Sequence, residues 1–329
     1  MNAVDAAQVS SGEIVRDLRA FLEQASRHGN EAVKPGHRIP FHWPPHPISH
    51  KFHVLASDWT GRATFEAHGE TFDVAVARTP HGVFGRCLQL WHEARGVDQD
   101  EMLTFLKAEA EPLFRRQFAI AETLGLEGRY QGSIQDLSPS ELVKLLYCSD
   151  RDVAAEAKTE IEKHASLGVF CPALIEILND DRHPMRRSAQ WCVLDLFEDL
   201  PRFCAGDADE ARCIDAMRNL IWNAKDDYAR TVYKAGVVLG GHLPDEHGGP
   251  VLLECLDAPS KYGRRSAIHG LFHVVEWHPE MRPRVVAALR AAAEKEADSQ
   301  LRDFAAAMAD DIEAEHYDHI PEPVFSEEA

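Results

Sequence analysis

The chain has 329 residues, of which 45% are hydrophobic and 27% are charged, and its formal net charge is −19. This composition is ordinary for a folded protein, and no apolar run approaches the length of a membrane-spanning helix, so membrane partners are not expected. Residues 138–329 carry most of the negative charge, with 36 acidic and 21 basic residues. Such a surface repels phosphate backbones, so nucleic acid is not expected as a partner, whereas a basic protein would be attracted. The alternative is a face that only aids solubility.

The seven cysteines are scattered along the chain, and no C-x-x-C pair occurs. Free cysteines on apolar helix faces behave as small hydrophobic residues, so the sequence predicts no metal site and no cofactor. The first residues lack the pattern of a secretory signal, and the cysteine usage favours a reducing, cytoplasmic location.

Residues 1–30 are predicted to form one amphipathic helix. Ser10 and Glu13 have the spacing of a capping box, and Ile14, Leu18 and Phe21 then recur at helical spacing. The polar face is mixed in charge rather than basic, so we expect this helix to dock on the protein body and not on a membrane.

Residues 34–50 contain five prolines and four histidines. Proline at this density excludes a helix or a central strand, so the sequence predicts an extended linker. The histidine spacing suggests a metal site, but a proline-broken segment does not place these side chains on one helical face. We therefore expect no metal there.

Residues 31–130 are predicted to form a small α+β domain built on an antiparallel sheet. Apolar and polar residues alternate from Ala63 to Val76, with turn residues between the runs, which is typical of three or four short strands. Asp98 and Glu101 then open a capped helix that ends near Gly125. Strands followed by a helix with an acidic start resemble the HicB-type antitoxin fold in pattern only.

Two segments further along read as copies of each other. Residues 172–198 and 250–276 align without a gap at an offset of 78, with Arg186–Ala189 identical to Arg264–Ala267. Two units of 39 residues have the length of helix-pair repeats. A middle unit contains Arg230 at the matching place, and weaker units on either side extend the array to about five helix pairs over residues 138–314.

These units resemble the HEAT-repeat family, in particular the short HEAT-like repeats of phycobilisome lyases. The first helix of each copy opens with proline and apolar residues, and the second opens with arginine, serine and alanine. The resemblance implies a mainly α fold, an α-α superhelix or solenoid, beside the small α+β domain. Residues 315–329 are predicted to form an acidic tail without packed structure.

No motif points clearly to catalysis. The phosphate-binding patterns GxxxxGK[ST] and GxGxxG and the nucleophile pattern GxSxG are absent. HEAT-like deoxyhypusine hydroxylases use several His-Glu pairs for iron, but here the pair occurs once, at His92-Glu93 and outside the repeats, so that site cannot be transferred. His269 and His273 have the i, i+4 spacing of helical zinc ligands without the HExxH pattern, so a structural role is favoured. We expect no enzyme.

The repeats place one stripe of polar and aromatic residues along their second helices. In HEAT-like families these helices usually line the concave face, so the resemblance makes the stripe a candidate partner-binding surface. For the arginines, pairing with acids of neighbouring units is the favoured alternative, whereas for tryptophan binding is favoured. The stripe comprises Arg187, Trp191, Asp195, Arg230, Lys234, Arg265, His269 and His273.

The sequence therefore favours a protein-binding scaffold or adaptor that neutralises or organises a basic protein partner. The alternative is a ligand- or chromophore-handling enzyme or chaperone that resembles bilin lyases. That alternative requires a pocket between the N-terminal domain and the repeats.

Overall fold

A computed structural model of the chain describes residues 10–27, 58–67, 70–87, 92–225, 229–243 and 248–316. The predicted linker 34–50 and the part of the predicted tail beyond residue 316 lie outside these ranges. The fold is mainly helical with one small antiparallel sheet, which confirms that part of the prediction. Within the described residues, no helix has both the length and the apolar character that crossing a membrane requires.

The chain divides into two compact units. The sheet unit comprises His28–Ser133 and Cys148–Val153. The helical unit comprises Met1–Arg27, Ile134–Tyr147 and Ala154–Ala329, so the first helix belongs with the helices of the second half of the chain.

The sheet unit contains four strands in sequence order, each antiparallel to the next. The strands are β1 (Trp59–Ala67), β2 (Glu70–Thr79), β3 (Gly82–Cys87) and β4 (His92–Gly96). Side chains alternate between the two faces of a strand, and this alternation buries Phe72, Val74 and Val76 on one face. The predicted period-2 pattern is therefore the core pattern of the sheet.

Helix α2 (Gln99–Leu124) covers the buried face of this sheet. It begins where predicted, because the Asp98 carboxylate accepts a hydrogen bond of 2.9 Å from the Glu101 backbone N–H. It ends at Gly125, which adopts a left-handed conformation with φ 69°. Phe114 packs on Phe72 with ring centroids 4.3 Å apart, at the centre of the core between helix and sheet.

The helical unit begins with α1 (Ser11–Arg27). Short 3-10 helices follow it in the described residues, namely η2 (Ile134–Asp136), η3 (Leu167–Val169), η4 (Phe197–Arg202) and η7 (Pro279–Met281). The remaining helices are α3 (Pro139–Leu145), α4 (Arg151–Glu162), α5 (Cys171–Leu178), α6 (Arg186–Leu196), α7 (Asp207–Trp222), α8 (Ala229–Gly241), α9 (Gly249–Cys255), α10 (Lys261–Trp277), α11 (Arg282–Lys295) and α12 (Ser299–Glu313).

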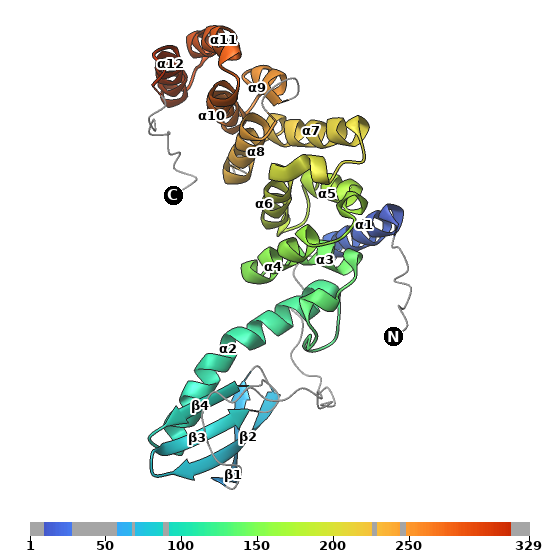
Figure 1. Ribbon diagram of the computed structural model, residues 1–329, viewed down its shortest axis with the longest axis vertical. Helices are drawn as coiled ribbons and strands as arrows, with labels where there is room; N and C mark the ends of the chain where they lie inside the picture. Colours follow the sequence, from blue (N-terminus) through green and yellow to red (C-terminus); the bar gives the residue numbers. More distant parts are fainter. Residues whose placement is uncertain are drawn as a thin grey trace. The chain divides into compact units, whose positions relative to one another are not determined.

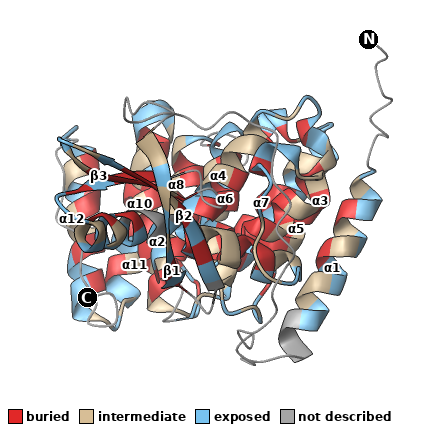
Figure 2. Ribbon diagram, turned by 90° about the horizontal axis from the view of Figure 1, so that it is seen from below, coloured by how far each residue is buried: buried red, intermediate tan, exposed pale blue. Residues whose placement is uncertain are grey.

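The helices of this unit lie in two layers. Figure 1 shows α6 and α8 on one side and α5 and α7 on the other, and contacts join α5 to α7, α6 to α8 and α8 to α10. Buried residues, red in Figure 2, lie on the faces that the helices turn toward one another, and exposed residues lie on the opposite faces. The buried faces of these helices therefore lie against neighbouring helices.

Helix α1 docks on α3 and α5. Ile14 and Leu18 lose almost all of their solvent exposure there, and the Arg19 guanidinium donates to the Glu176 carboxylate at 2.6 Å. The amphipathic pattern of the first thirty residues thus serves docking within the helical unit, as expected.

Helices α8 and α10 approach each other at backbone distance. A Cβ atom added to Gly270 would lie 2.6 Å from the Gly236 carbonyl oxygen, so no larger residue fits without a shift. The Ser266 hydroxyl donates to the Val232 carbonyl at 2.7 Å across the same contact. Small residues four apart on both helices allow this approach and fix the relative positions of the side chains that flank it.

Candidate functional site

The eight residues of the predicted stripe all lie on three helices, α6, α8 and α10. Helix α6 carries three of them, α8 carries two, and α10 carries three, and the α6–α8 and α8–α10 contacts bring these helices together. The structure gathers six of the eight into two clusters. Arg187 and Arg230 lie in the first turns of α6 and α8; Arg187 is half-buried and Arg230 is exposed.

The first cluster is centred on the Asp195 carboxylate. It pairs with two ammonium groups, those of Lys234 and Lys158, the latter at 3.3 Å. Lys234 also lies 3.1 Å from the Glu198 carboxylate, and its ammonium stands 4.7 Å from the centre of the Trp191 ring. A lysine over an aromatic face is attracted to the ring quadrupole, so this cluster combines ion pairs with a cation–π contact.

Burial shapes the chemistry of this cluster. It lowers the pKa of Lys234, and the neighbouring Lys158 cation acts in the same direction. Only 13% of the Lys234 side chain is exposed, whereas Trp191 keeps 41% of its surface in solvent. The lysine is therefore held beneath the ring, and the ring is the part of this cluster that is most exposed to solvent.

The second cluster runs from α8 onto α10. The Arg265 guanidinium lies 5.0 Å from the Tyr233 ring centre, and the same ring packs 4.6 Å from the His269 ring. His269 and His273 hydrogen-bond through their Nε2 atoms at 3.0 Å, and His273 Nδ1 contacts the Glu276 carboxylate at 2.7 Å. The chain of contacts therefore runs along α10 from Arg265 to Glu276.

Burial separates the roles of the α10 residues. Arg265 is only 8% exposed, so it braces α10 against α8 and offers little surface to a partner. His269 and His273 are half-buried and point at each other. Neither histidine belongs to a group of three possible metal ligands among the residues that the structure describes.

Sequence reasoning missed several members of this surface. Lys158 lies on α4 and reaches Asp195 across 37 residues of chain, and no local pattern signals such a contact. Trp277 is 66% exposed and follows His273 by four residues, so the i, i+4 spacing that defined the stripe could have included it. Tyr233 precedes Lys234 in the chain, and its ring packs on His269 of the second cluster.

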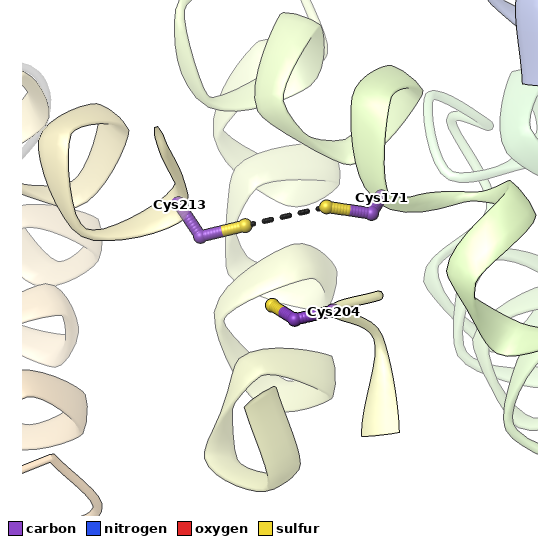
Figure 3. A group of neighbouring side chains, drawn as sticks. All are labelled: Cys171, Cys204 and Cys213. Carbon is purple, nitrogen blue, oxygen red and sulfur yellow. Dashed lines mark hydrogen bonds between the residues drawn. The ribbon is translucent and has the colours of Figure 1, made fainter. Parts of the chain in front are cut away.

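A second group of residues lies away from the stripe. Cys171, Cys204 and Cys213 come from the start of α5, the segment before α7, and the second turn of α7. Their three Sγ atoms all lie within 4.8 Å of one another, and Cys171 Sγ is 3.5 Å from Cys213 Sγ. Figure 3 shows the sulfur atoms of Cys171 and Cys213 pointing at each other, with Cys204 beside them. The scattered spacing of the cysteines in the sequence concealed this grouping.

The three thiols differ in acidity. The hydrogen bond from Cys213 lowers the pKa of Cys171 and raises that of Cys213 itself. Burial raises the pKa of Cys204 to about 12. The first thiolate of the cluster therefore forms at Cys171.

Comparison with known families, curated proteins and solved structures finds no match for this chain. Its function must therefore be inferred from its own residues and geometry.

A solvent-open groove of about 550 Å³ runs along α1 beside Pro172. Val15, Arg16 and Arg19 of α1 line it. All of these residues belong to the helical unit, so this groove is not the pocket between the two domains that a ligand-handling protein would need.

Proposed function

We propose that the helical unit is a HEAT-like scaffold that binds a protein partner through the stripe on α6, α8 and α10. The observation that carries the proposal is Trp191, a large aromatic residue that remains 41% exposed although Lys234 fixes its ring. Tryptophan is among the residues that most often dominate binding energy at protein interfaces.

The repeated sequence and the two helix layers support the solenoid part of this proposal. Segments 78 residues apart match without a gap, and they form α5 with α6 and α9 with α10. A helix pair that buries its faces only against neighbouring pairs is the unit of such arrays. The second helices of these pairs would then present the stripe as one surface.

Preorganisation supports the assignment of Trp191. The ring cannot move freely, because the ammonium beneath it is held by Asp195 and Glu198. Ordering a large side chain at an interface costs about 0.5–1.5 kcal/mol. A ring that is already fixed avoids most of that cost, so its apolar surface contributes more fully to affinity.

Charge supports a basic partner. Residues 138–329 have a formal balance of −15, and the carboxylates of Glu198 and Glu276 lie beside the stripe with 43% and 37% of their side chains exposed. Partners of opposite charge are steered to such a surface, and the steering weakens as salt increases. We expect the partner to carry lysine or arginine around an apolar anchor that packs on Trp191.

Affinity capture from the host, with quantitative mass spectrometry, tests this function. The perturbing variant is Trp191→Ala and the matched control is Trp222→Ala on α7. Trp222 also has a cation over its ring, since the Arg218 guanidinium lies 5.3 Å from the ring centre. It belongs to α7 and is therefore outside the stripe on α6, α8 and α10. Both variants must first show the thermal stability of the wild type.

A partner captured by wild type and by Trp222→Ala, but lost with Trp191→Ala, is the expected result. Binding of that purified partner should weaken about 30-fold, which corresponds to a hot-spot contribution of about 2 kcal/mol. Equal retention by both variants would remove Trp191 from the interface and with it the proposed surface.

A further inference from the structure

Three cysteines that are far apart in sequence converge inside the helical unit. Cys171 and Cys213 are completely buried and Cys204 is partly exposed. Chance packing of cysteines as small apolar residues does not require their sulfur atoms to gather, yet here all three lie within 4.8 Å of one another (Figure 3). Thiolate sulfur is the softest ligand that a protein side chain offers.

We propose that Cys171, Cys204 and Cys213 together bind one soft metal ion, Cu(I), through three thiolate sulfurs. This site is independent of the stripe on α6, α8 and α10, because its ligands come from α5, α7 and the segment between η4 and α7.

The separations of the sulfur atoms suit such a site. With metal–sulfur bonds of about 2.3 Å, three sulfurs around one ion lie about 4.0 Å apart in a trigonal plane. Here the closest pair is at 3.5 Å and all separations fall within 4.8 Å. Small side-chain movements therefore suffice for coordination, whereas a disulfide would need the closest pair to approach to about 2.05 Å.

The number of ligands favours Cu(I) over Zn(II). Structural zinc sites almost always have four protein ligands in a tetrahedron. Across the described ranges, no histidine, aspartate, glutamate or further cysteine joins the three thiols within coordinating distance. Cu(I) has a filled d shell, binds soft sulfur strongly and accepts three ligands, so the donor set matches it.

The binding step balances without electron transfer. One Cu(I) replaces three thiol protons, three Cu–S bonds form, and three protons leave to solvent, which gives a site with a net charge of −2. Because protons are released, affinity should rise with pH.

Occupation of the site would join three segments of the scaffold. The start of α5 and the second turn of α7 belong to consecutive helix pairs, and the ion would cross-link them. A ligand that binds only the folded state stabilises that state. We therefore expect Cu(I) to raise the melting temperature of the full-length chain.

Competition with a coloured cuprous chelator, under anaerobic and fully reducing conditions, tests the proposal on the full-length protein. The probe is Cu(I) alone, with Zn(II) in a parallel titration. Wild type is compared with Cys204→Ala, which removes the partly exposed ligand, and with Cys255→Ala. Cys255 is a fully buried cysteine on α9 outside the cluster, so it controls for loss of any thiol. Melting of the metal-free proteins establishes that each variant folds.

We expect wild type and Cys255→Ala to take one Cu(I) per chain from the chelator. Loss of an outer-shell partner alone costs 10–100-fold in metal affinity, so loss of the Cys204 ligand should cost at least about 100-fold. X-ray absorption of the loaded wild type should report three sulfur neighbours. Unchanged affinity in Cys204→Ala, failure of reduced wild type to take up Cu(I), or preferential binding of Zn(II) would each overturn the assignment.

Discussion

The backbone contact between α8 and α10 makes a quantitative prediction about Gly270. Substitution by alanine places a Cβ atom 2.6 Å from the Gly236 carbonyl oxygen and 2.9 Å from Leu252 Cδ1. Ordinary van der Waals contact begins at 3.4 Å, so the helices must separate locally by about 0.8 Å. The Ser266 hydrogen bond to Val232 would then stretch from 2.7 to about 3.5 Å, the limit of a useful hydrogen bond.

These terms can be combined. Overpacking of a tight interface costs about 1–3 kcal/mol, and the weakened hydrogen bond costs about 1 kcal/mol more. The gain in helix propensity from glycine to alanine offsets about 1 kcal/mol. We therefore expect Gly270→Ala to lower the free energy of unfolding by about 2 kcal/mol, measured by urea denaturation and far-ultraviolet circular dichroism.

Gly241→Ala is the matched control for this prediction. Gly241 is the last residue of α8, and the nearest atom to an added Cβ there is 3.9 Å away, which is an ordinary contact. This variant should be as stable as wild type or slightly more stable. If Gly270→Ala unfolded at the same urea concentration as the control, α8 and α10 could not be in backbone contact and the reasoning would be refuted.

Two further predictions concern charge and pH. Arg264 donates two hydrogen bonds, of 2.6 and 2.9 Å, to the Glu296 carboxylate. Burial raises the pKa of Glu296. The hydrogen bonds from Arg264 and from the Asp298 backbone outweigh burial and hold this pKa below its ordinary value. Glu296→Gln should therefore lower the free energy of unfolding by about 2 kcal/mol at pH 7, and this difference from wild type should shrink as pH falls through the lowered pKa. If urea titrations gave the same difference at every pH, the ion pair would be contradicted. Burial lowers the pKa of His183, and its Nδ1 accepts a hydrogen bond of 3.0 Å from the Met185 backbone N–H. Because this pKa is lower in the folded protein, the unfolded chain binds a proton at His183 before the folded chain does as pH falls below 6.5. The free energy of unfolding should fall more for wild type than for His183→Gln between pH 7.5 and 5.5. Equal falls in the two proteins would exclude His183 as the source of this pH dependence.

The features that the sequence predicted well are those set by neighbouring residues. Asp98 and Gly125 bound α2 because a cap depends on a few adjacent positions. The alternation around Phe72 and Val74 predicted a strand with one buried face, and the sheet has that face. The helical spacing of Trp191 and Asp195 placed both on one side of α6 for the same reason.

The features that could not be predicted depend on residues distant in sequence. Lys158 meets Asp195 only because α4 and α6 are brought together, and the sequence contains no signal for the distance between them. The odd, scattered cysteines predicted no metal site, yet Cys171 and Cys204 are brought together across 33 residues by the packing of helix pairs. Proximity in space, rather than motif spacing, therefore carries the metal proposal.

Charge satisfaction explains why the aromatic residue is the stronger candidate within the stripe. The Asp195 carboxylate already pairs with Lys158 and Lys234, so a partner that used these groups would have to replace existing ion pairs. Exchanging one ion pair for another yields little net free energy. The exposed Trp191 ring can be covered without breaking an ion pair. Each Å² of its apolar surface that a partner removes from water contributes about 25 cal/mol of favourable binding free energy. In the proposed function, the charges of the stripe would therefore orient the ring and steer the partner, and affinity would come from covering the ring.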